Sequence, residues 1–428
     1  ICDPGERGGA RHRYGRSRPP EEADMEAGGR RVPRRADVVI IGGGVMGVST
    51  AFHLAALGCR DVVVVEREEV LGAGSTGRSA GGVRVQFSTE VNIRLSAWSI
   101  ELLRRFEELT GVASGLRQYG YLIVTSDPAT MARFEADVAL QRSLGFHVRL
   151  LAPRQARELV PQLEIGDLVG ATFSPHDGYA DPHSVVHGFA RRARESGVRF
   201  FTELEAVGVA VRAGRVEGIE VRPATRAALT TESAGGAPAI IEAPVVVNAA
   251  GPFAAEIGRM AGVDVPVQPY RRMVFVTEPI GVFRPDLPMV IDFDSGFYVR
   301  REGERLLLGM ADPDEGPSFR TDVDWGFLPR VLQRGVHRLP ALAEASVTRG
   351  WAGLYEVSPD HNGIVGPSAS PKGFYVAAGF SGHGFQQAPA VGRVLAEMIL
   401  GQRPTIDVSE LSPDRFSAGR ALVEQKVI

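Results

Sequence analysis

The sequence predicts a mixed α/β (α+β) fold, in which a unit built on an interrupted parallel sheet is combined with an inserted antiparallel sheet. Two β-branched runs flank a glycine-rich turn and a helix-like stretch between residues 38 and 66, which is the pattern of a βαβ unit. Between residues 265 and 310, short β-rich runs follow one another without helices, as in an antiparallel sheet. At 428 residues the chain is long enough to form both units.

The glycine-rich turn has the spacing of a dinucleotide-binding motif. Gly42, Gly44 and Gly47 form G-x-G-x-x-G directly after a β-branched run. In such a motif the first glycine permits the tight turn, the second lets a pyrophosphate approach the backbone, and the third lets the helix lie against the sheet. The N-terminus of the helix then offers free N–H groups to the phosphates. Glu66 ends the next β-branched run, about 20 residues further on, where a carboxylate binds an adenosine ribose. These features together predict a Rossmann-like dinucleotide site, since a turn without a ligand would leave Glu66 unexplained.

Composition describes a soluble globular chain. The net charge of −3 and the hydrophobic content of 44% give no reason to expect a nucleic-acid partner. Cys2 and Cys59 allow neither a disulfide framework nor a cysteine metal site, which is compatible with a cytoplasmic location. The uncharged run at residues 38–59 contains three consecutive glycines and His53, so we expect no membrane span.

Residues 1–35 differ from the rest of the chain. They are rich in Arg, Gly, Pro and Glu and lack apolar periodicity, so we expect a disordered tail. Met25 lies inside this stretch. Translated upstream sequence and a basic tail that binds a partner both remain as interpretations.

The elements that follow are predicted from periodicity and capping residues. Asp127 and Asp181 each precede a proline, which is typical of a helix N-terminus. We expect helices at residues 90–109, 128–144, 153–159, 182–196, 324–339 and 387–400. We expect strands at 121–125, 272–277, 289–292, 296–301 and 305–310, and a buried strand that enters a turn within 244–251. A hairpin is expected at 206–221 and a flexible polar loop at 223–239. Strands at 347–354, 363–365 and 374–378 are expected to be buried and parallel.

Four stretches of the chain resemble the D-amino-acid-oxidase-like superfamily of FAD enzymes. They are the glycine motif with Glu66, the loop at residues 74–84, Val-Val-Asn-Ala-Ala-Gly at 246–251, and residues 351–366 followed by Gly-Phe-Ser-Gly-His-Gly-Phe-Gln at 379–386. The resemblance extends from about residue 37 to the C-terminus and is greatest to sarcosine oxidases, sarcosine dehydrogenases and glycine oxidases. It implies a FAD-binding domain at residues 36–84, 150–262 and 346–428, and a substrate domain at 85–149 and 263–345.

FAD is also favoured by the second glycine-rich loop. A plain NAD enzyme gives this loop no role, whereas backbone N–H groups there can face the pyrimidine edge of a flavin, where negative charge gathers on reduction. No second G-x-G-x-x-G offers a site for NADPH. We expect FAD contacts from Gly42, Gly44, Val45, Met46, Gly47, Glu66, Arg67, Thr76, Arg78, Ser79, Gly81, Gly82, Val207, Ala249, Gly251, Gly353, Gly379, Gly382, His383, Gly384 and Phe385.

The resemblance also indicates that the FAD is held without a covalent bond. Related oxidases carry a flavin-linked cysteine two residues before the position of Tyr355, and this chain has Gly353 there. The histidine that anchors flavin in sarcosine dehydrogenases is expected around residues 76–79, where this chain has none.

Four residues are candidates for the catalytic site. The resemblance places Arg84 near the reactive edge of the ring, where it would clamp a substrate carboxylate, although a surface-loop arginine is the alternative. Tyr355 and Tyr298 are either substrate contacts or packing residues. Gln386 stands where monomeric sarcosine oxidases have a carboxylate-binding lysine. Leu307 stands where those oxidases have an oxygen-activating lysine, which favours a dehydrogenase over an oxidase.

The resemblance implies oxidation of the C–N bond of a small amino acid or secondary amine such as sarcosine, glycine or proline. Hydride would pass to flavin N5, and electrons would leave to an unknown acceptor. Two alternatives remain: a FAD-containing assembly factor of a respiratory complex, and a subunit of an amine-dehydrogenase complex. No metal is expected, because His183 and His187 lack a third ligand in sequence reach.

Overall fold

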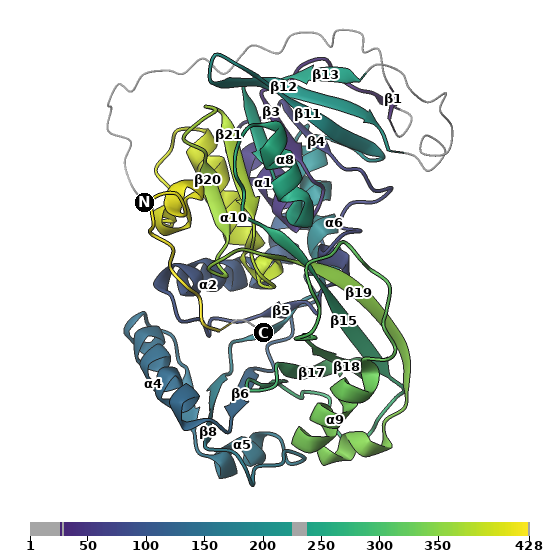
Figure 1. The fold of residues 1–428 in the computed structure, drawn as a ribbon, viewed down its shortest axis with the longest axis vertical. Coiled ribbons are helices and arrows are strands. Elements are labelled where there is room, and N and C mark those ends of the chain that lie inside the picture. Colours follow the sequence, from purple (N-terminus) through teal and green to yellow (C-terminus); the bar gives the residue numbers. More distant parts are fainter. Residues whose placement is uncertain (1–25, 28–29, 225–237, 427–428) are drawn as a thin grey trace.

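The computed structural model describes residues 26–27, 30–224 and 238–426 (Figure 1). Most of the predicted N-terminal tail and of the polar loop at 223–239 lies outside these residues. The end of the predicted tail belongs to the fold, however. Strands β1 (Glu26–Ala27) and β2 (Arg30–Arg31) pair with each other, and Val32 is buried. None of the helices in the described part of the chain is long and apolar enough to cross a membrane.

A six-stranded sheet forms the predicted dinucleotide-binding unit. Its order is β10 (Arg199–Phe201), β4 (Val62–Val65), β3 (Val38–Ile41), β14 (Val245–Asn248), β21 (Phe374–Ala378) and β20 (Ile364–Pro367). The first five strands are parallel, and β20 runs antiparallel to β21. Every residue of β3 and β4 is buried, as expected for a parallel sheet covered on both faces.

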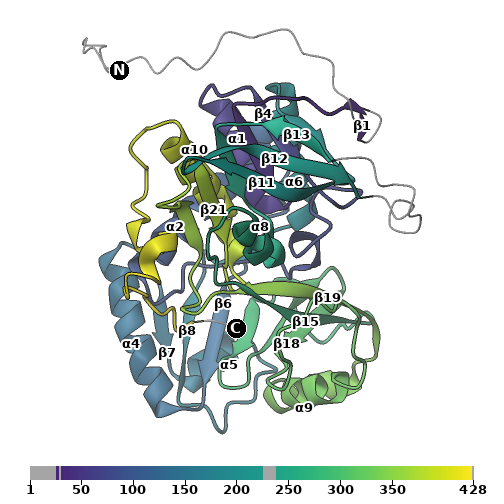
Figure 2. The same cartoon turned by 45° about the horizontal axis from the view of Figure 1, so that its top comes forward.

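Each face of this sheet has its own apolar core, because alternate side chains of a strand point to opposite faces. Val38 and Ile40 pack toward the helices α1 (Val45–Ala56), α2 (Glu90–Arg104), α6 (Pro182–Glu195) and α10 (Gly384–Ile399). Val39 and Ile41 pack toward α8 (Ala254–Met260) and the sheet of β11 (Leu204–Arg212), β12 (Arg215–Pro223) and β13 (Ala239–Glu242). Figure 2 shows β11, β12 and β13 together in the upper half of the view, with α8 below them.

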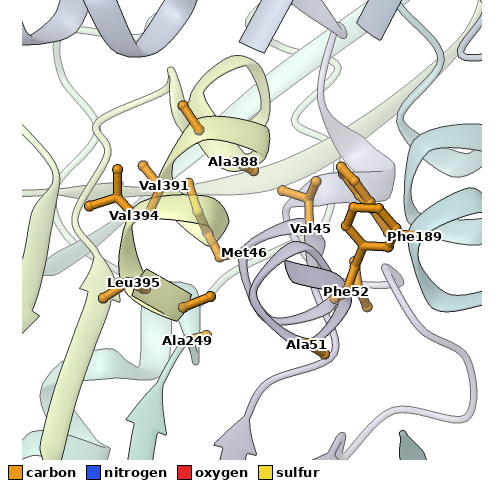
Figure 3. Packing of buried hydrophobic residues seen from close by; sticks show 14 of the residues in the cluster. Val45, Met46, Ala51, Phe52, Phe189, Ala249, Ala388, Val391, Val394 and Leu395 are labelled. Carbon is orange, nitrogen blue, oxygen red and sulfur yellow. The ribbon is translucent and has the colours of Figure 1, made fainter. Parts of the chain in front are cut away.

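The helices α1 and α10 are in close contact (Figure 3). A Cβ atom at Gly392 would lie 2.3 Å from Ser49 Oγ and 2.8 Å from the backbone nitrogen of Thr50. Ser49 Oγ donates a hydrogen bond of 2.8 Å to the carbonyl of Ala388. This contact fixes the N-terminus of one helix relative to that of the other.

The second sheet has eight strands. Its order is β19 (Val347–Val357), β15 (Gln268–Thr277), β18 (Arg305–Met310), β17 (Phe297–Glu302), β16 (Met289–Asp292), β6 (Tyr121–Thr125), β8 (Gly170–Ser174) and β7 (Arg149–Leu151). Its neighbours are antiparallel except β16 and β6, which are parallel, so the sheet is mixed rather than purely antiparallel.

Several elements differ from the prediction in partner or direction. Strand β19 pairs antiparallel with β15, and β20 pairs antiparallel with β21, so of the three strands predicted to be parallel only β21 is. Strands β7 and β8 lie in the eight-stranded sheet, although residues 150–262 were assigned to the other domain. Helix α2, from the segment assigned to the substrate domain, packs in the core of α1 and α10. An apolar run in the sequence indicates that a strand is buried, but it does not indicate which other strand pairs with it or in which direction.

The helix boundaries agree closely with the capping signals. Helix α4 (Pro128–Ser143) is capped by Asp127, which accepts from the backbone nitrogens of Ala129 and Thr130. Asp181 caps α6 in the same way. The helix predicted at 90–109 is divided into α2 and α3 (Phe106–Thr110). The remaining elements of the described residues are α5 (Pro153–Leu159), α9 (Leu328–Arg338), β5 (Gly82–Val83), β9 (Gly178–Tyr179) and the short helices η1 (Thr76–Arg78), η3 (Gly251–Phe253), η4 (Pro340–Glu344), η5 (Ser409–Leu411) and η6 (Pro413–Arg415).

Candidate active site

A cavity of about 440 Å³ extends from the glycine motif to the second glycine-rich turn. The part lined by Gly42 and Glu66 is called the near end here, and the part lined by Gly382 and Gln386 the far end. The two turns, far apart in sequence, therefore face the same space. The eight-stranded sheet contributes the wall at the far end through Arg272, Tyr298 and other residues.

The motif glycines differ in what surrounds them. Gly42 has a φ of 111°, and a Cβ there would lie 2.3 Å from the carbonyl oxygen of Ala249. Gly47 is equally constrained, since its Cβ would lie 1.9 Å from the carbonyl oxygen of Gly42. The nearest atom to a Cβ at Gly44 is Thr76 Oγ1, at 3.3 Å, and Gly44 lines the cavity. Gly44 is thus the glycine that leaves room for a ligand, whereas Gly47 serves helix packing.

Glu66 lies at the near end of the cavity, beside the first glycine turn. Its Oε2 accepts from the backbone nitrogen of Gly43 at 2.7 Å, and its Oε1 accepts from that of Glu68 at 2.9 Å. These bonds hold the carboxylate against the glycine turn, and each oxygen keeps a lone pair for a further donor. Burial raises the pKa of Glu66, and the two backbone hydrogen bonds oppose this change.

An aromatic stack at the same end was not predicted from the sequence. The guanidinium carbon of Arg67 lies 3.6 Å from the centre of the Phe253 ring, and Phe253 stacks on Phe319 at 4.6 Å. All three residues line the cavity. Phe319 comes from the loop that follows β18, so the stack joins the two parts of the molecule. No motif marks Phe253 or Phe319, because their contact depends on the folded chain.

The middle of the cavity is formed by the loop around η1. Thr76 Oγ1 accepts from the backbone nitrogen of Val45 at 3.1 Å. Arg78 Nη1 donates to the carbonyl of Ala352 at 3.0 Å, and Trp351 Nε1 donates to the carbonyl of Arg78 at 2.9 Å. These bonds fasten the loop to β19.

Gly353 lies at this junction and has no space for a larger side chain. A Cβ there would lie 2.9 Å from Arg78 Cβ. A cysteine at this position would force the loop to move. This crowding explains the glycine at position 353, and a FAD held without a covalent bond stays a prediction.

The second glycine-rich turn lies against Tyr355. Gly382 has a φ of 100°, and a Cβ there would lie 2.3 Å from the Tyr355 ring. The turn leads into α10, for which His383 is the N-cap residue. Burial lowers the pKa of His383 to about 3, so the imidazole is neutral at physiological pH.

The cavity lining contains polar atoms without hydrogen-bond partners. Among the described residues, this is true of Ser75 Oγ, Ser79 Oγ, Arg272 Nε, Glu356 Oε2 and His383 Nε2. Buried polar atoms are almost always satisfied. A ligand with donors and acceptors along its length, as FAD has, would satisfy them, so the residues present fit this cofactor.

Glu356 is unusual among these groups. Burial raises the pKa of its carboxyl to about 7, against weak opposition from the backbone nitrogens of Phe380 and Gly379. The carboxyl is therefore partly protonated at neutral pH. No motif in the sequence marks Glu356, and its position next to Tyr355 is the one signal that could have identified it.

Arg84 differs from its predicted role. Its Nη1 donates to the carbonyl of Gln86, and its Nη2 donates to that of Lys426 at 2.5 Å. The guanidinium also packs on Phe87, at 4.2 Å from the ring centre. Arg84 lines the cavity, but its donors hold the main chain rather than facing a substrate carboxylate. The side-chain oxygen of Gln386 accepts from the Arg84 backbone nitrogen at 2.7 Å and is likewise engaged.

The wall from the substrate sheet is apolar with a few polar groups. Tyr298 is nearly buried, and Leu307 beside it is fully buried in the same apolar cluster. Burial raises the pKa of Tyr298, of Tyr355 and of Tyr121, so all three hydroxyls stay protonated. Arg272 also lines this wall and was not singled out from the sequence.

Most of the predicted FAD contacts line the cavity, and three do not. Gly47, Val207 and Gly379 are absent from the lining. A Cβ at Gly379 would meet Ile364 and Val267 at 3.2 Å, so this glycine serves packing. Contact of FAD with the remaining residues stays a prediction. No group of three or more His, Cys, Asp or Glu side chains in the described ranges is arranged to hold a metal ion.

The βαβ unit, the acidic residue that follows it and the second glycine turn at the other end of one cavity define a dinucleotide-type flavoprotein. The chain belongs to the DAO family of FAD dependent oxidoreductases, whose model matches residues 37–398. FAD is therefore its cofactor.

The comparisons with known proteins give relatives over most of the chain. The Bos taurus "FAD-dependent oxidoreductase domain-containing protein 1" is 34% identical over 440 residues, covering 92% of this chain and 88% of the relative. Human mitochondrial sarcosine dehydrogenase is 30% identical over 402 residues, which cover 90% of this chain but only 42% of that protein.

Solved structures share the whole fold. L-Proline dehydrogenase from P. horikoshii has a TM-score of 0.81 and 33% identity, covering 91% of this chain and 99% of that chain. Glycine oxidase from Geobacillus kaustophilus shares the fold with a TM-score of 0.76 at 24% identity, covering 89% of this chain and 99% of that chain.

Proposed function

We propose that the protein oxidises the C–N bond of a small amino acid or secondary amine of the sarcosine, glycine or proline type, and passes the electrons to an acceptor other than oxygen. The observation that carries this proposal is the cavity itself. Its far end lies between the second glycine turn and an apolar sheet wall, so an amine there would be next to the ring end of the cofactor. Bound FAD supplies the acceptor for the hydride that leaves the carbon next to nitrogen. The imine product would then be hydrolysed by water.

The names of related proteins support the substrate class. Relatives include a sarcosine dehydrogenase and a dimethylglycine dehydrogenase, and a structural neighbour is an L-proline dehydrogenase. Each name states the substrate of that relative, and we propose a substrate of the same class for this chain.

The wall residues favour an uncharged amine. Val274, Met289, Ile291 and Tyr298 give the wall an apolar surface that excludes water. A low-dielectric environment disfavours a charged ammonium group, so the amine would bind as the neutral base. A neutral amine can lose hydride without a general base, so this step needs no proton transfer to a side chain. His383 in the cavity lining is neutral and adds no positive charge there.

The preference for an acceptor other than oxygen rests on the lack of a nearby lysine. The lysines of the sequence are Lys372 and Lys426, and neither lines the cavity. Lys426 is buried, with its Nζ 3.3 Å from an Asp137 carboxylate oxygen. Leu307 stands where the resemblance to monomeric sarcosine oxidases places the oxygen-activating lysine. Without a lysine ammonium beside the ring, superoxide would lack the stabilisation that such a group provides.

Anaerobic reduction of the bound flavin tests this proposal. The FAD-loaded protein is mixed with sarcosine, dimethylglycine, glycine, proline and matched amines without a carboxylate, and the loss of flavin absorbance is followed. We expect at least one amino acid to bleach the flavin, and reoxidation by an artificial acceptor to be faster than by oxygen.

No bleaching by any amine would contradict the proposal. If the protein also co-purified with a larger complex, that result would support an assembly factor or a subunit of a dehydrogenase complex instead. A cytoplasmic location stays a prediction from cysteine usage.

A further inference from the structure

We propose that Arg272 binds the carboxylate of the substrate and makes the cavity selective for amines that carry an acidic group. The inference rests on the proposed function, because it assumes that the amine occupies the far end of this cavity. Arg272 lies on β15, in the wall that the substrate sheet contributes.

The pairing of β15 with β19 turns Arg272 toward the cavity. Arg272 lies opposite Gly353, and two residues along each strand Tyr270 lies opposite Tyr355. Side chains two residues apart on a strand share a face, so Arg272 and Tyr355 face the cavity together. The guanidinium carbon lies 5.1 Å from the centre of the Tyr355 ring. Gly353, the residue opposite Arg272 on β19, has no side chain that could cover the guanidinium.

The hydrogen bonding of Arg272 is incomplete. Its Nη1 donates to the carbonyl of Arg271 at 3.0 Å. Its Nε is buried and has no acceptor among the residues that the structure describes. A buried donor on a charged group is costly to leave without an acceptor. A carboxylate would satisfy it with charge-assisted hydrogen bonds.

Other buried arginines already have their acceptors, which makes Arg272 different. Arg84 is one of the arginines with acceptors, since its Nη1 and Nη2 each donate to a main-chain carbonyl. The carboxylate-paired examples are Arg271 with Glu315 at 2.6 Å, Arg338 with Asp292 at 3.2 Å, and Arg415 with Asp360 at 2.8 Å. Of Arg84 and Arg272, Arg272 is therefore the one with a buried nitrogen that lacks an acceptor among the described residues.

The test measures ligand binding rather than turnover. The FAD-loaded protein is titrated with cyclopentanecarboxylate and with neutral cyclopentanecarboxamide, which have the same ring and contain no ring amine to oxidise. Binding is followed by calorimetry and by the change in flavin absorbance. We expect the wild-type protein to bind the carboxylate at least about tenfold more tightly than the carboxamide. Arg272→Gln should weaken carboxylate binding by about 10- to 100-fold and carboxamide binding by less than about threefold.

The matched control is Arg349→Gln. Arg349 is an exposed residue of β19 outside the cavity lining, so the variant removes a positive charge from the same sheet. We expect its carboxylate affinity to equal that of the wild type. FAD stoichiometry and melting temperature verify that each variant is folded.

Three results would overturn the inference: unchanged carboxylate affinity in Arg272→Gln, an equal loss in Arg349→Gln, or a wild-type protein that does not prefer the charged ligand. The last comparison needs no variant, so it can refute the inference even if Arg272→Gln does not fold. Loss of carboxylate binding in Arg272→Gln, in a protein whose flavin no amine reduces, would refute the proposed function and support the anion site.

Discussion

Substitution of Gly44 separates cofactor binding from folding. Its φ of −73° is accessible to any residue, and a Cβ would meet only the hydroxyl of Thr76, at 3.3 Å. An alanine there should leave the apoprotein as stable as before or stabilise it by about 0.4–1 kcal/mol. The added methyl group points into the cavity at the N-terminus of α1, where the pyrophosphate of FAD is expected. Overpacking of this kind costs about 1–3 kcal/mol, which corresponds to a loss of FAD affinity of roughly 5- to 150-fold.

The assay compares three glycine variants of the apoprotein. FAD affinity is measured from the quenching of flavin fluorescence, and stability from the melting temperature without FAD. Gly281→Ala is the matched control, since Gly281 has no atom within 4 Å of the added Cβ and does not line the cavity. Gly47→Ala should instead impair folding, because its Cβ would lie 1.9 Å from a backbone oxygen. Unchanged FAD affinity in a folded Gly44→Ala protein would refute the assignment of the phosphate site.

Two further predictions concern buried ionisable groups. Because the pKa of Glu356 is about 7 in the folded protein and its ordinary value is 4.5, the unfolded chain loses this proton first, and stability falls as pH rises through that window. Glu356→Gln should therefore stabilise the apoprotein relative to wild type by roughly 2–3 kcal/mol more at pH 8 than at pH 5 in urea unfolding, and a pH-independent difference would contradict this reasoning. Arg415 donates from Nε and Nη2 to Asp360 at 2.8 and 2.9 Å, and both side chains are 1% exposed. Arg415→Met should lower the free energy of unfolding by about 3–5 kcal/mol, because Asp360 is left buried and unpaired, and a loss below about 1 kcal/mol would show that the pair is dispensable.

Local sequence signals predicted the geometry of the first glycine turn well. The turn at Gly42, the room at Gly44 and the position of Glu66 depend on one continuous βαβ unit, so residue type and spacing carry the information. The caps at Asp127 and Asp181 were readable for the same reason.

Features that depend on distant partners were not predictable in this way. The Arg84 guanidinium bonds to Lys426, which is 342 residues further along the chain. Arg272 faces the cavity because of its register with β19, and a buried apolar run does not reveal its neighbour or its direction. The stack of Phe253 on Phe319 likewise joins segments that only the folded chain brings together.

The central claim is that one FAD spans the cavity, with its adenosine at Glu66 and its ring at the second glycine turn. A crystal structure of the FAD-loaded protein tests this most directly. We predict ribose hydroxyls within hydrogen-bond distance of Glu66, and an isoalloxazine ring between residues 382–386 and the wall that carries Tyr355 and Arg272. A ring found outside this cavity, or an adenosine far from Glu66, would contradict the account.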